Sequence, residues 1–218
     1  KLIMTEVFRD GEYSIVKKDE RYAVFCGNEE LKTPSGKPAT TLYLPLADRL
    51  LRDWKEKGYD SYKSAKSILS FHFTMVEFYA GVTKEAAVMM LNLSHWENSW
   101  TLQGCPSGNP RMMMAWMSYF GPAREKIELI HQWFNNCTRM QLVAALCVYN
   151  AMMDYNVAYF WAAVVEELDE SEHEEAIRDF YDFLCQFDEF YAFDEFLTIF
   201  DNFRLYYGIH LREDGKHL

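Results

Sequence analysis

The sequence predicts an α+β protein in which a small N-terminal antiparallel β unit precedes a larger α-helical bundle. Short runs rich in β-branched and aromatic residues, separated by turn signals, occupy residues 5–44. Beyond Pro45, apolar residues recur at helical spacing to near the C-terminus. The chain has 218 residues, of which 50% are apolar and 25% charged. That length and composition are typical of a globular protein with a substantial core.

The β unit is predicted from its strands and turns in order. Residues 13–16 and 22–26 are short β-rich runs, and Gly27-Asn28 marks a turn after the second. A stronger turn follows at residues 34–37, where proline, serine and glycine cluster. Residues 40–44 can then return as a further strand, which gives a sheet of three or four strands.

The helical region is predicted from apolar periodicity and from capping residues. Thr83 and Thr138 stand where each can cap a helix, and Ser171 with Glu174 has the spacing of a capping box. The stretch 142–149 is apolar on all sides, which predicts a central, buried helix. The predicted helices cover residues 46–57, 61–79, 85–93, 110–120, 123–136, 139–154, 156–168, 171–185 and 192–207.

Two domains are predicted, because the spacing of apolar residues changes from that of strands to that of helices along the chain. Residues 1–58 form the small β domain with its following helix, and residues 59–218 form the helical domain. Residues 101–110 hold two glycines and two prolines, which is typical of a loop and makes this segment a possible hinge.

Charge is distributed unevenly along the chain. The formal net charge is −11; residues 1–153 carry 18 basic and 16 acidic side chains, and residues 154–218 carry 4 and 17. This balance argues against nucleic acid as a partner and points to an acidic face that meets a protein. A solvated acidic surface that keeps the chain soluble is the alternative. No apolar run approaches membrane-spanning length, so no membrane insertion is expected, and the start at Lys1 leaves room for a removed presequence.

The five cysteines are odd in number, widely spaced and free of any CxxC pair. Neither a disulfide framework nor a zinc site is therefore predicted, and reduced thiols in an intracellular compartment are the simplest interpretation. Nucleotide-binding glycine patterns and the nucleophile-elbow pattern are also missing from the sequence. We expect no cofactor, no bound metal and no catalytic residues.

One catalytic alternative stays open. Glu170 and His173 are three residues apart, so on a helix they share a face and can bind a metal ion. Cys105 lies between Gly104 and Pro106 in the predicted loop, where a nucleophile can be exposed. A metal-dependent or cysteine-dependent hydrolase in the helical domain is thus the alternative function. Acidic residues also favour a helix N-terminus, which accounts for Glu170 without any metal.

Aromatic and acidic residues alternate near the C-terminus at helical spacing, so each helix there should have an aromatic side and an acidic side. Exposed aromatic residues would form an apolar patch with an acidic rim, a surface suited to another protein. An acidic mimic of nucleic acid is a further alternative, although the aromatic residues favour packed helices. Phe193 and Phe196 are the aromatic candidates for contact with a partner.

One stretch of the β domain carries a family resemblance. It consists of the strand at residues 22–25 and the segment 27–38, which contains Leu31-Lys32-Thr33-Pro34-Ser35-Gly36. Leu46-Ala47-Asp48 and the Trp54, Glu56 and Gly58 group follow at similar spacing. These segments resemble the assembly chaperones that bind the alpha subunit of the ATP synthase catalytic head. The segments 139–145 and 158–170 are similar to paired late helices of that family, with His173 where the family has glutamine.

The resemblance implies a non-catalytic chaperone with a β domain followed by a helical domain. Its client would be an unassembled ATP synthase alpha subunit or a similar protein, bound through an apolar surface with an acidic rim. It would act in the bacterial cytoplasm or the mitochondrial matrix. Family acidic residues map onto Asp169 or Glu170. The predicted partner-binding residues are Glu166, Glu167, Asp169, Glu170, Phe193 and Phe196.

Overall fold

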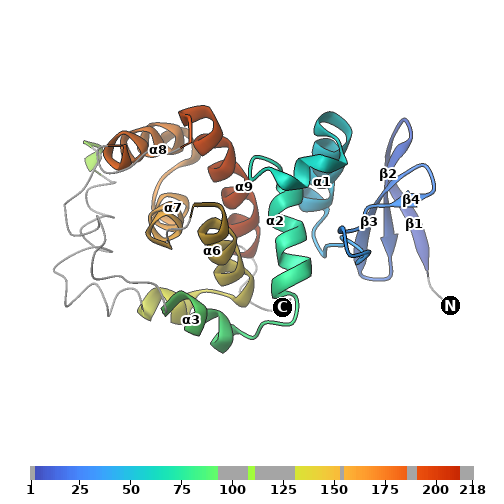
Figure 1. Ribbon diagram of the computed structural model, residues 1–218, viewed down its shortest axis with the longest axis horizontal. Helices are drawn as coiled ribbons and strands as arrows, with labels where there is room; N and C mark the ends of the chain where they lie inside the picture. The colour runs from blue at the N-terminus through green and yellow to red at the C-terminus, as the bar shows by residue number, and fades with distance from the viewer. Residues whose placement is uncertain (1–2, 93–107, 111–130, 153–154, 186–190, 212–218) are drawn as a thin grey trace. The chain divides into compact units, whose positions relative to one another are not determined.

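The structure, a computed structural model, confirms the α+β class, with a four-stranded antiparallel sheet followed by helices (Figure 1). The chain forms two compact units, residues 1–82 and 83–218. The structure describes residues 3–92, 108–110, 131–152, 155–185 and 191–211. The predicted helix over 110–120 lies outside those ranges except for Pro110, as do Cys105 and residues 123–130 of the next predicted helix. The rest of that helix, residues 131–136, is helical as predicted.

The sheet is a meander in which each strand pairs with the next. Strands β2 (Tyr13–Lys18) and β3 (Arg21–Cys26) confirm the two predicted strands, and β4 (Glu29–Glu30) is shorter than expected. The predicted returning strand at residues 40–44 is wrong, because this segment makes only an isolated bridge between Tyr22 and Thr41.

The first strand, β1 (Met4–Asp10), is not predicted from the sequence. It pairs with β2 along its length, with a register shift between Glu6 and Phe8 that leaves Val7 as the extra residue of a bulge. All seven of its residues are exposed, so no buried face imposes the strict alternation by which a strand is recognised.

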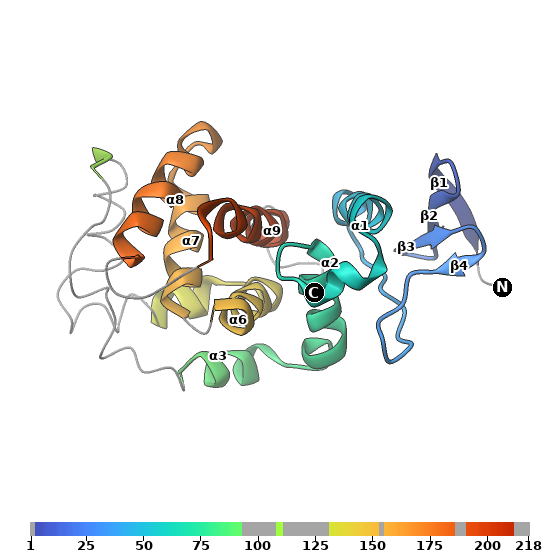
Figure 2. The same ribbon diagram turned by 45° about the horizontal axis from the view of Figure 1, so that its top comes forward.

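Helix α1 (Leu44–Lys57) covers the sheet, as Figure 2 shows. Its buried face carries the apolar residues that predict it, among them Leu46 and Leu50. The Trp54 ring meets the Tyr13 ring of β2 edge to face, with centroids 5.5 Å apart. Gly58 ends the helix at a φ of 81°, a conformation that glycine adopts without strain.

The segment predicted as one helix over residues 61–79 is three short elements. A 3₁₀ turn η1 (Tyr59–Lys63) precedes helix α2 (Ile68–Thr74), which continues as a π-helical turn η2 (Met75–Tyr79). Helix α2 begins after its N-cap Ser67, whose hydroxyl accepts the Leu69 backbone N–H at 3.2 Å, and the Asp53 carboxylate of α1 accepts the Ile68 backbone N–H at 2.8 Å. This bond ties the segment to α1, so the first unit extends to Val82, past the predicted boundary at 58.

The second unit is a helical bundle around one buried helix. Residues 140–148 of α6 are all buried, which confirms the prediction of a central helix, and α6 packs against α3, α7 and α9. The predicted caps at Thr83 and Thr138 are confirmed, since their hydroxyls accept the Ala86 and Gln141 backbone N–H groups at 3.1 Å. The described helices of this unit are α3 (Lys84–Asn92), α6 (Arg139–Met152), α7 (Tyr155–Glu167), α8 (Glu170–Leu184) and α9 (Phe193–Leu211).

Aromatic rings from α7, α8 and α9 fill the core of the bundle. The Trp161 ring lies 5.1 Å from Phe196 and 5.4 Å from Phe200 between centroids, and Phe160 stacks on Phe180 at 3.8 Å. All five side chains are buried. Most of the described aromatic residues that alternate with acidic residues in the C-terminal sequence therefore pack inside the bundle.

Helix α8 begins two residues before the predicted capping box. The Asp169 backbone N–H donates to the Glu172 carboxylate at 3.1 Å, so the reciprocal pair is Asp169 and Glu172 and not Ser171 and Glu174. The four cysteines within the described ranges are free thiols. No helix among the described residues is long and apolar enough to cross a membrane.

Candidate protein-binding surfaces

Three of the six predicted partner-binding residues meet at the turn between α7 and α8. Glu167, Asp169 and Glu170 are exposed, while Leu168 between them is buried and anchors the turn. Asp169 and Glu170 stand at the N-terminus of α8, where negative charge is stabilised by the exposed backbone N–H groups. Their position leaves both residues exposed to solvent, although Glu170 also lies 3.9 Å from the Arg204 guanidinium.

The exposed face of α8 extends this negative surface. Glu174 and Glu175 are exposed one turn further along, with Arg178 as an exposed basic residue on the same helix. Residues 83–218 carry 9 basic and 21 acidic side chains. Such a surface attracts basic partners and repels acidic ones. We call Glu167, Asp169, Glu170, Glu174 and Glu175 the acidic corner.

Glu166 does not belong to the acidic corner. Its carboxylate accepts a hydrogen bond from the Tyr207 hydroxyl of α9, and that hydroxyl accepts the Trp133 indole N–H at 3.0 Å. Burial, together with the nearby Cys137 and Glu166, raises the pKa of Tyr207 well above its usual value, so the hydroxyl keeps its proton. Glu166 thus holds α7 to α9 and is half-buried.

The two predicted aromatic contacts have different environments. Phe196 is fully buried, with its ring 5.1 Å from Trp161 and 5.2 Å from Tyr181, so it belongs to the core and not to a binding surface. Phe193 is half-buried, and the Arg178 guanidinium lies 3.9 Å from its ring centroid. The expected aromatic patch is not formed by this pair.

Both ring nitrogens of His173, the histidine of the catalytic alternative, are engaged. Its Nδ1 lies 3.3 Å from Nη1 of Arg204, and its Nε2 lies 3.1 Å from the Leu168 carbonyl oxygen. A guanidinium only donates, so Nδ1 accepts and Nε2 carries the proton. Burial lowers the pKa of His173.

A metal ion at His173 would have to displace one of these partners. Glu170, the second residue of that alternative, extends into solvent with 84% of its side chain exposed. The described part of the chain contains no group of three or more potential metal ligands. Cys105, the other nucleophile candidate, falls outside it.

The structure adds a surface that sequence reasoning missed, at the edge of the sheet. Ile3 is 70% exposed, Met4 53%, Val7 43% and Phe8 42%. A single exposed apolar residue is ordinary on a protein surface, but here four occur within six residues of the chain. The available signal was the Met-Thr-Glu-Val-Phe run before Gly11-Glu12, which combines strand-forming residues with a turn. In the register with β2, Met4 lies opposite Lys18 and Phe8 opposite Ile15, so these two side chains project on opposite faces of the sheet. We call Ile3, Met4, Val7 and Phe8, the exposed apolar residues along this strand, the β1 patch.

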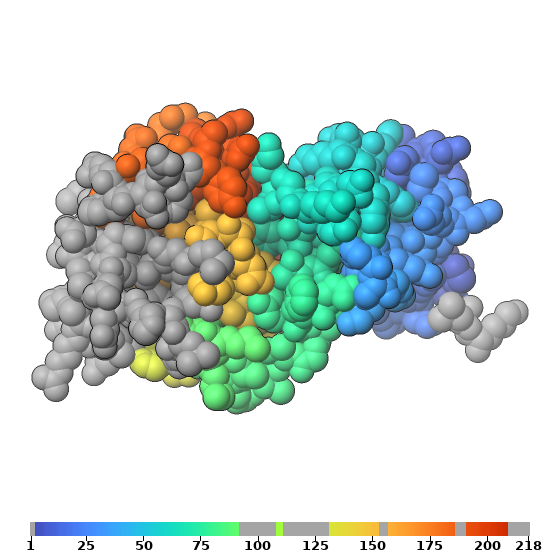
Figure 3. Space-filling model, in the orientation of Figure 1, coloured from blue at the N-terminus to red at the C-terminus, as the bar shows by residue number. Residues whose placement is uncertain are grey.

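Among the residues that the structure describes, strand β1 pairs on one side only, because it is the first in the strand order β1-β2-β3-β4. Its other side presents backbone N–H and C=O groups that can pair with an added strand. Strand β1 has a bulge at Val7 and an ion pair between Glu6 and Arg9 at 2.5 Å. Bulges and charged side chains are features by which natural edge strands avoid pairing with unrelated chains. In the space-filling view the darkest-blue residues lie at the surface (Figure 3).

Comparison of this chain with protein-family models, with curated proteins and with solved structures finds no match.

Proposed function

We propose that this protein is a non-catalytic assembly chaperone that binds an extended, apolar segment of an unassembled subunit along strand β1. The observation that carries the proposal is the β1 patch, four large apolar side chains exposed beside the unpaired edge of a sheet. An unassembled subunit exposes apolar segments that its own partners will later cover. Pairing with β1 would satisfy the backbone of such a segment, and the patch would cover its apolar side chains.

The client that the sequence favours is the unassembled ATP synthase alpha subunit. The clearest of the segments that resemble the alpha-subunit chaperones lie within residues 22–58, in the same compact unit as β1. In this proposal the chain acts where ATP synthase heads are assembled, in the bacterial cytoplasm or the mitochondrial matrix. The acidic corner in the second unit would contribute steering and selectivity toward basic regions of the client.

Binding energy in this proposal comes mainly from apolar burial. Covering apolar surface contributes about 25 cal/mol per Å², so a few large side chains are enough to change affinity measurably. Charge adjacent to the edge mostly changes the association rate. The central variant is therefore Val7→Lys, which puts a charge at the middle of the β1 patch without removing a buried side chain.

The test measures binding of the full-length chain to the purified, unassembled alpha subunit by biolayer interferometry. We expect Val7→Lys to weaken binding by about tenfold, which corresponds to about 1.4 kcal/mol. Gln132→Lys is the matched control, because it adds the same charge at an exposed position of the second unit. Equal affinity for Val7→Lys and Gln132→Lys would reject β1 as the docking edge, and lack of any binding by the unaltered chain would reject this client.

A further inference from the structure

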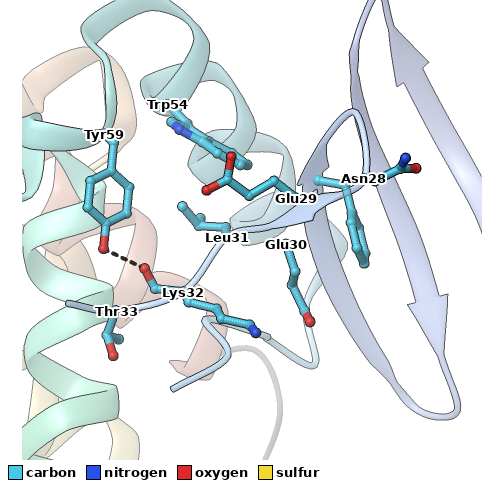
Figure 4. A pocket seen from close by; sticks show the side chains of 9 residues that line it. Asn28, Glu29, Glu30, Leu31, Lys32, Thr33, Trp54 and Tyr59 are labelled. Carbon is cyan, nitrogen blue, oxygen red and sulfur yellow. Dashed lines mark hydrogen bonds between the residues drawn. The ribbon is translucent and has the colours of Figure 1, made fainter. Parts of the chain in front are cut away.

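A cavity of about 650 Å³ opens in the first unit, beside β4 and apart from the β1 patch. Aromatic residues Phe25, Trp54 and Tyr59 line it together with Leu31, which is fully buried and forms an apolar wall (Figure 4). The cavity plays no part in the chaperone function proposed above. Aromatic walls with a few charged groups are typical of a site for a cationic ligand.

One side of the cavity already holds a cation of this chain. The Lys18 ammonium lies 5.1 Å from the centroid of the Phe25 ring and forms an ion pair with Glu30 at 3.0 Å. An aromatic face and a carboxylate together thus bind a basic side chain here. This arrangement occupies Phe25 and Glu30, and it leaves the opposite side, at Trp54 and Tyr59, to a ligand.

That opposite side has its own carboxylate. Glu29 is exposed and forms no ion pair with any residue in the described ranges, and in Figure 4 it points toward the Trp54 indole. Burial raises the pKa of Tyr59, and the negative charge of Glu29 is among the further causes. The Lys32 side chain points away from Trp54 and Tyr59 in the same view. The free charge at this side is therefore negative.

The aromatic wall is held in place before any ligand arrives. The Tyr59 hydroxyl donates to the Lys32 carbonyl oxygen at 2.7 Å, and its ring packs against Tyr62 and Phe73 with centroids 5.4 and 5.8 Å away. Trp54 is 92% covered, mostly by the core of the unit. A ligand therefore meets a preorganised surface, which reduces the entropy lost on binding.

We propose that this cavity binds an arginine side chain of a basic peptide segment. The guanidinium would lie against the ring of Tyr59, beside the small part of Trp54 that stays exposed to the cavity, and donate two parallel hydrogen bonds to the Glu29 carboxylate. A planar, weakly hydrated guanidinium suits this combination better than an ammonium group, which forms no such parallel pair. The inference does not depend on client binding at β1, since the two surfaces lie on different edges of the sheet.

The experiment follows Trp54, the sole tryptophan in residues 1–82, by fluorine NMR of the full-length chain labelled with 5-fluorotryptophan. The probe is a blocked pentapeptide with one central arginine between glycines. Its counterpart carries citrulline, which keeps the shape and loses the charge. We expect a saturable shift of the Trp54 signal with the arginine peptide, at least threefold weaker binding of the citrulline peptide, and weaker arginine-peptide binding at high salt.

Two variants separate the site from general attraction between charges. Glu29→Gln should weaken the arginine peptide roughly three- to fivefold, the size expected when an exposed ion pair and its hydrogen bonds are removed. Glu20→Gln removes the same charge from an exposed turn of the same unit and should leave binding unchanged. Equal weakening by the two variants, equal shifts with arginine and citrulline peptides, or no Trp54 shift would overturn the proposal, whatever the outcome at β1.

Discussion

The Asp53 carboxylate of α1 accepts the backbone N–H of Ile68 at 2.8 Å and so fixes the first turn of α2. Its Oδ2 also accepts the Ser67 hydroxyl at 3.3 Å, while Arg49 and Lys57 lie 3.3 and 3.4 Å from its two oxygens. Asp53 is only 3% exposed. A buried carboxylate is tolerated here because every oxygen has a partner, and the group joins α1 to the segment that follows it.

Replacement of this carboxylate should destabilise the first unit. Asp53→Ala leaves the Ile68 N–H without its acceptor and Arg49 and Lys57 without their counter-ion, which should lower the free energy of unfolding by about 3 kcal/mol. Urea denaturation followed by circular dichroism measures this. Asp48→Ala on the same helix removes only a surface pair with Arg52, at 3.0 Å, and should cost less than about 1 kcal/mol. Equal losses in the two variants would contradict the role given to Asp53.

The buried His72 should make stability depend on pH. Its Nε2 lies 3.0 Å from the Thr40 carbonyl oxygen, so Nε2 carries the proton, and its buried Nδ1 has no hydrogen-bond partner within the described ranges. Burial lowers the pKa of His72 from 6.5 to about 4. Between these values the unfolded chain binds the extra proton and the folded chain does not. Stability is therefore unaffected by His72 above pH 6.5 and falls as the pH drops from 6.5 toward 4.

The His72 contribution should reach about 3 kcal/mol near pH 4. It is measured as the free energy of unfolding in urea at pH 7 and at pH 4.5. His72→Gln keeps an N–H donor but has no titrating ring, so its loss between the two pH values should be smaller than that of the unaltered chain. His131→Gln is the control at an exposed histidine and should leave the pH dependence as it is. An unchanged pH dependence in His72→Gln would refute this assignment.

Elements that bury an apolar face were the ones the sequence could predict. Helix α1 was predicted within two residues because its buried leucines recur each turn and Gly58 ends it. Strand β1 was missed because it is held by backbone pairing with β2 and leaves all its side chains exposed. The continuous helix over 61–79 was wrong because the chain is extended at Ser67, which caps α2, and because Asp53, distant in sequence, binds the Ile68 N–H.

The sequence could predict only the part of the candidate site that lies at a helix end. Acidic residues at a helix start face solvent, and Asp169 and Glu170 do. Neighbours in a helix point about 100° apart, so composition alone did not separate Glu166, bound to Tyr207, from exposed Glu167. Phe196 was misplaced for a related reason, because alternating aromatic and acidic residues do not show which side packs inward.

Glu166 and Glu167 should therefore respond differently to the same change. Glu166→Gln replaces the strong acceptor of the Tyr207 hydroxyl with a weaker one and should lower the free energy of unfolding by about 1 kcal/mol. Glu167→Gln should cost less stability, because Glu167 is exposed, and should slow association with a basic client, because it removes one charge from the acidic corner. Urea denaturation and stopped-flow association rates separate the two. A stability loss in Glu167→Gln matching that in Glu166→Gln would count against this division.

The contact between Arg204 and His173 predicts a change in the titration of that histidine. Burial is the main reason why the pKa of His173 is lowered, and the positive charge of Arg204, with Nη1 3.3 Å from Nδ1, lowers it further. Arg204→Leu should therefore raise the pKa of His173, because Glu170 and Glu172 then act on it unopposed. A pH titration of the ring by ¹⁵N NMR reports the shift directly. Arg178→Leu is the control, because Arg178 lies on the same helix as His173 but stacks on Phe193. A His173 pKa that rises in Arg178→Leu and not in Arg204→Leu would contradict the role given to the Arg204 contact.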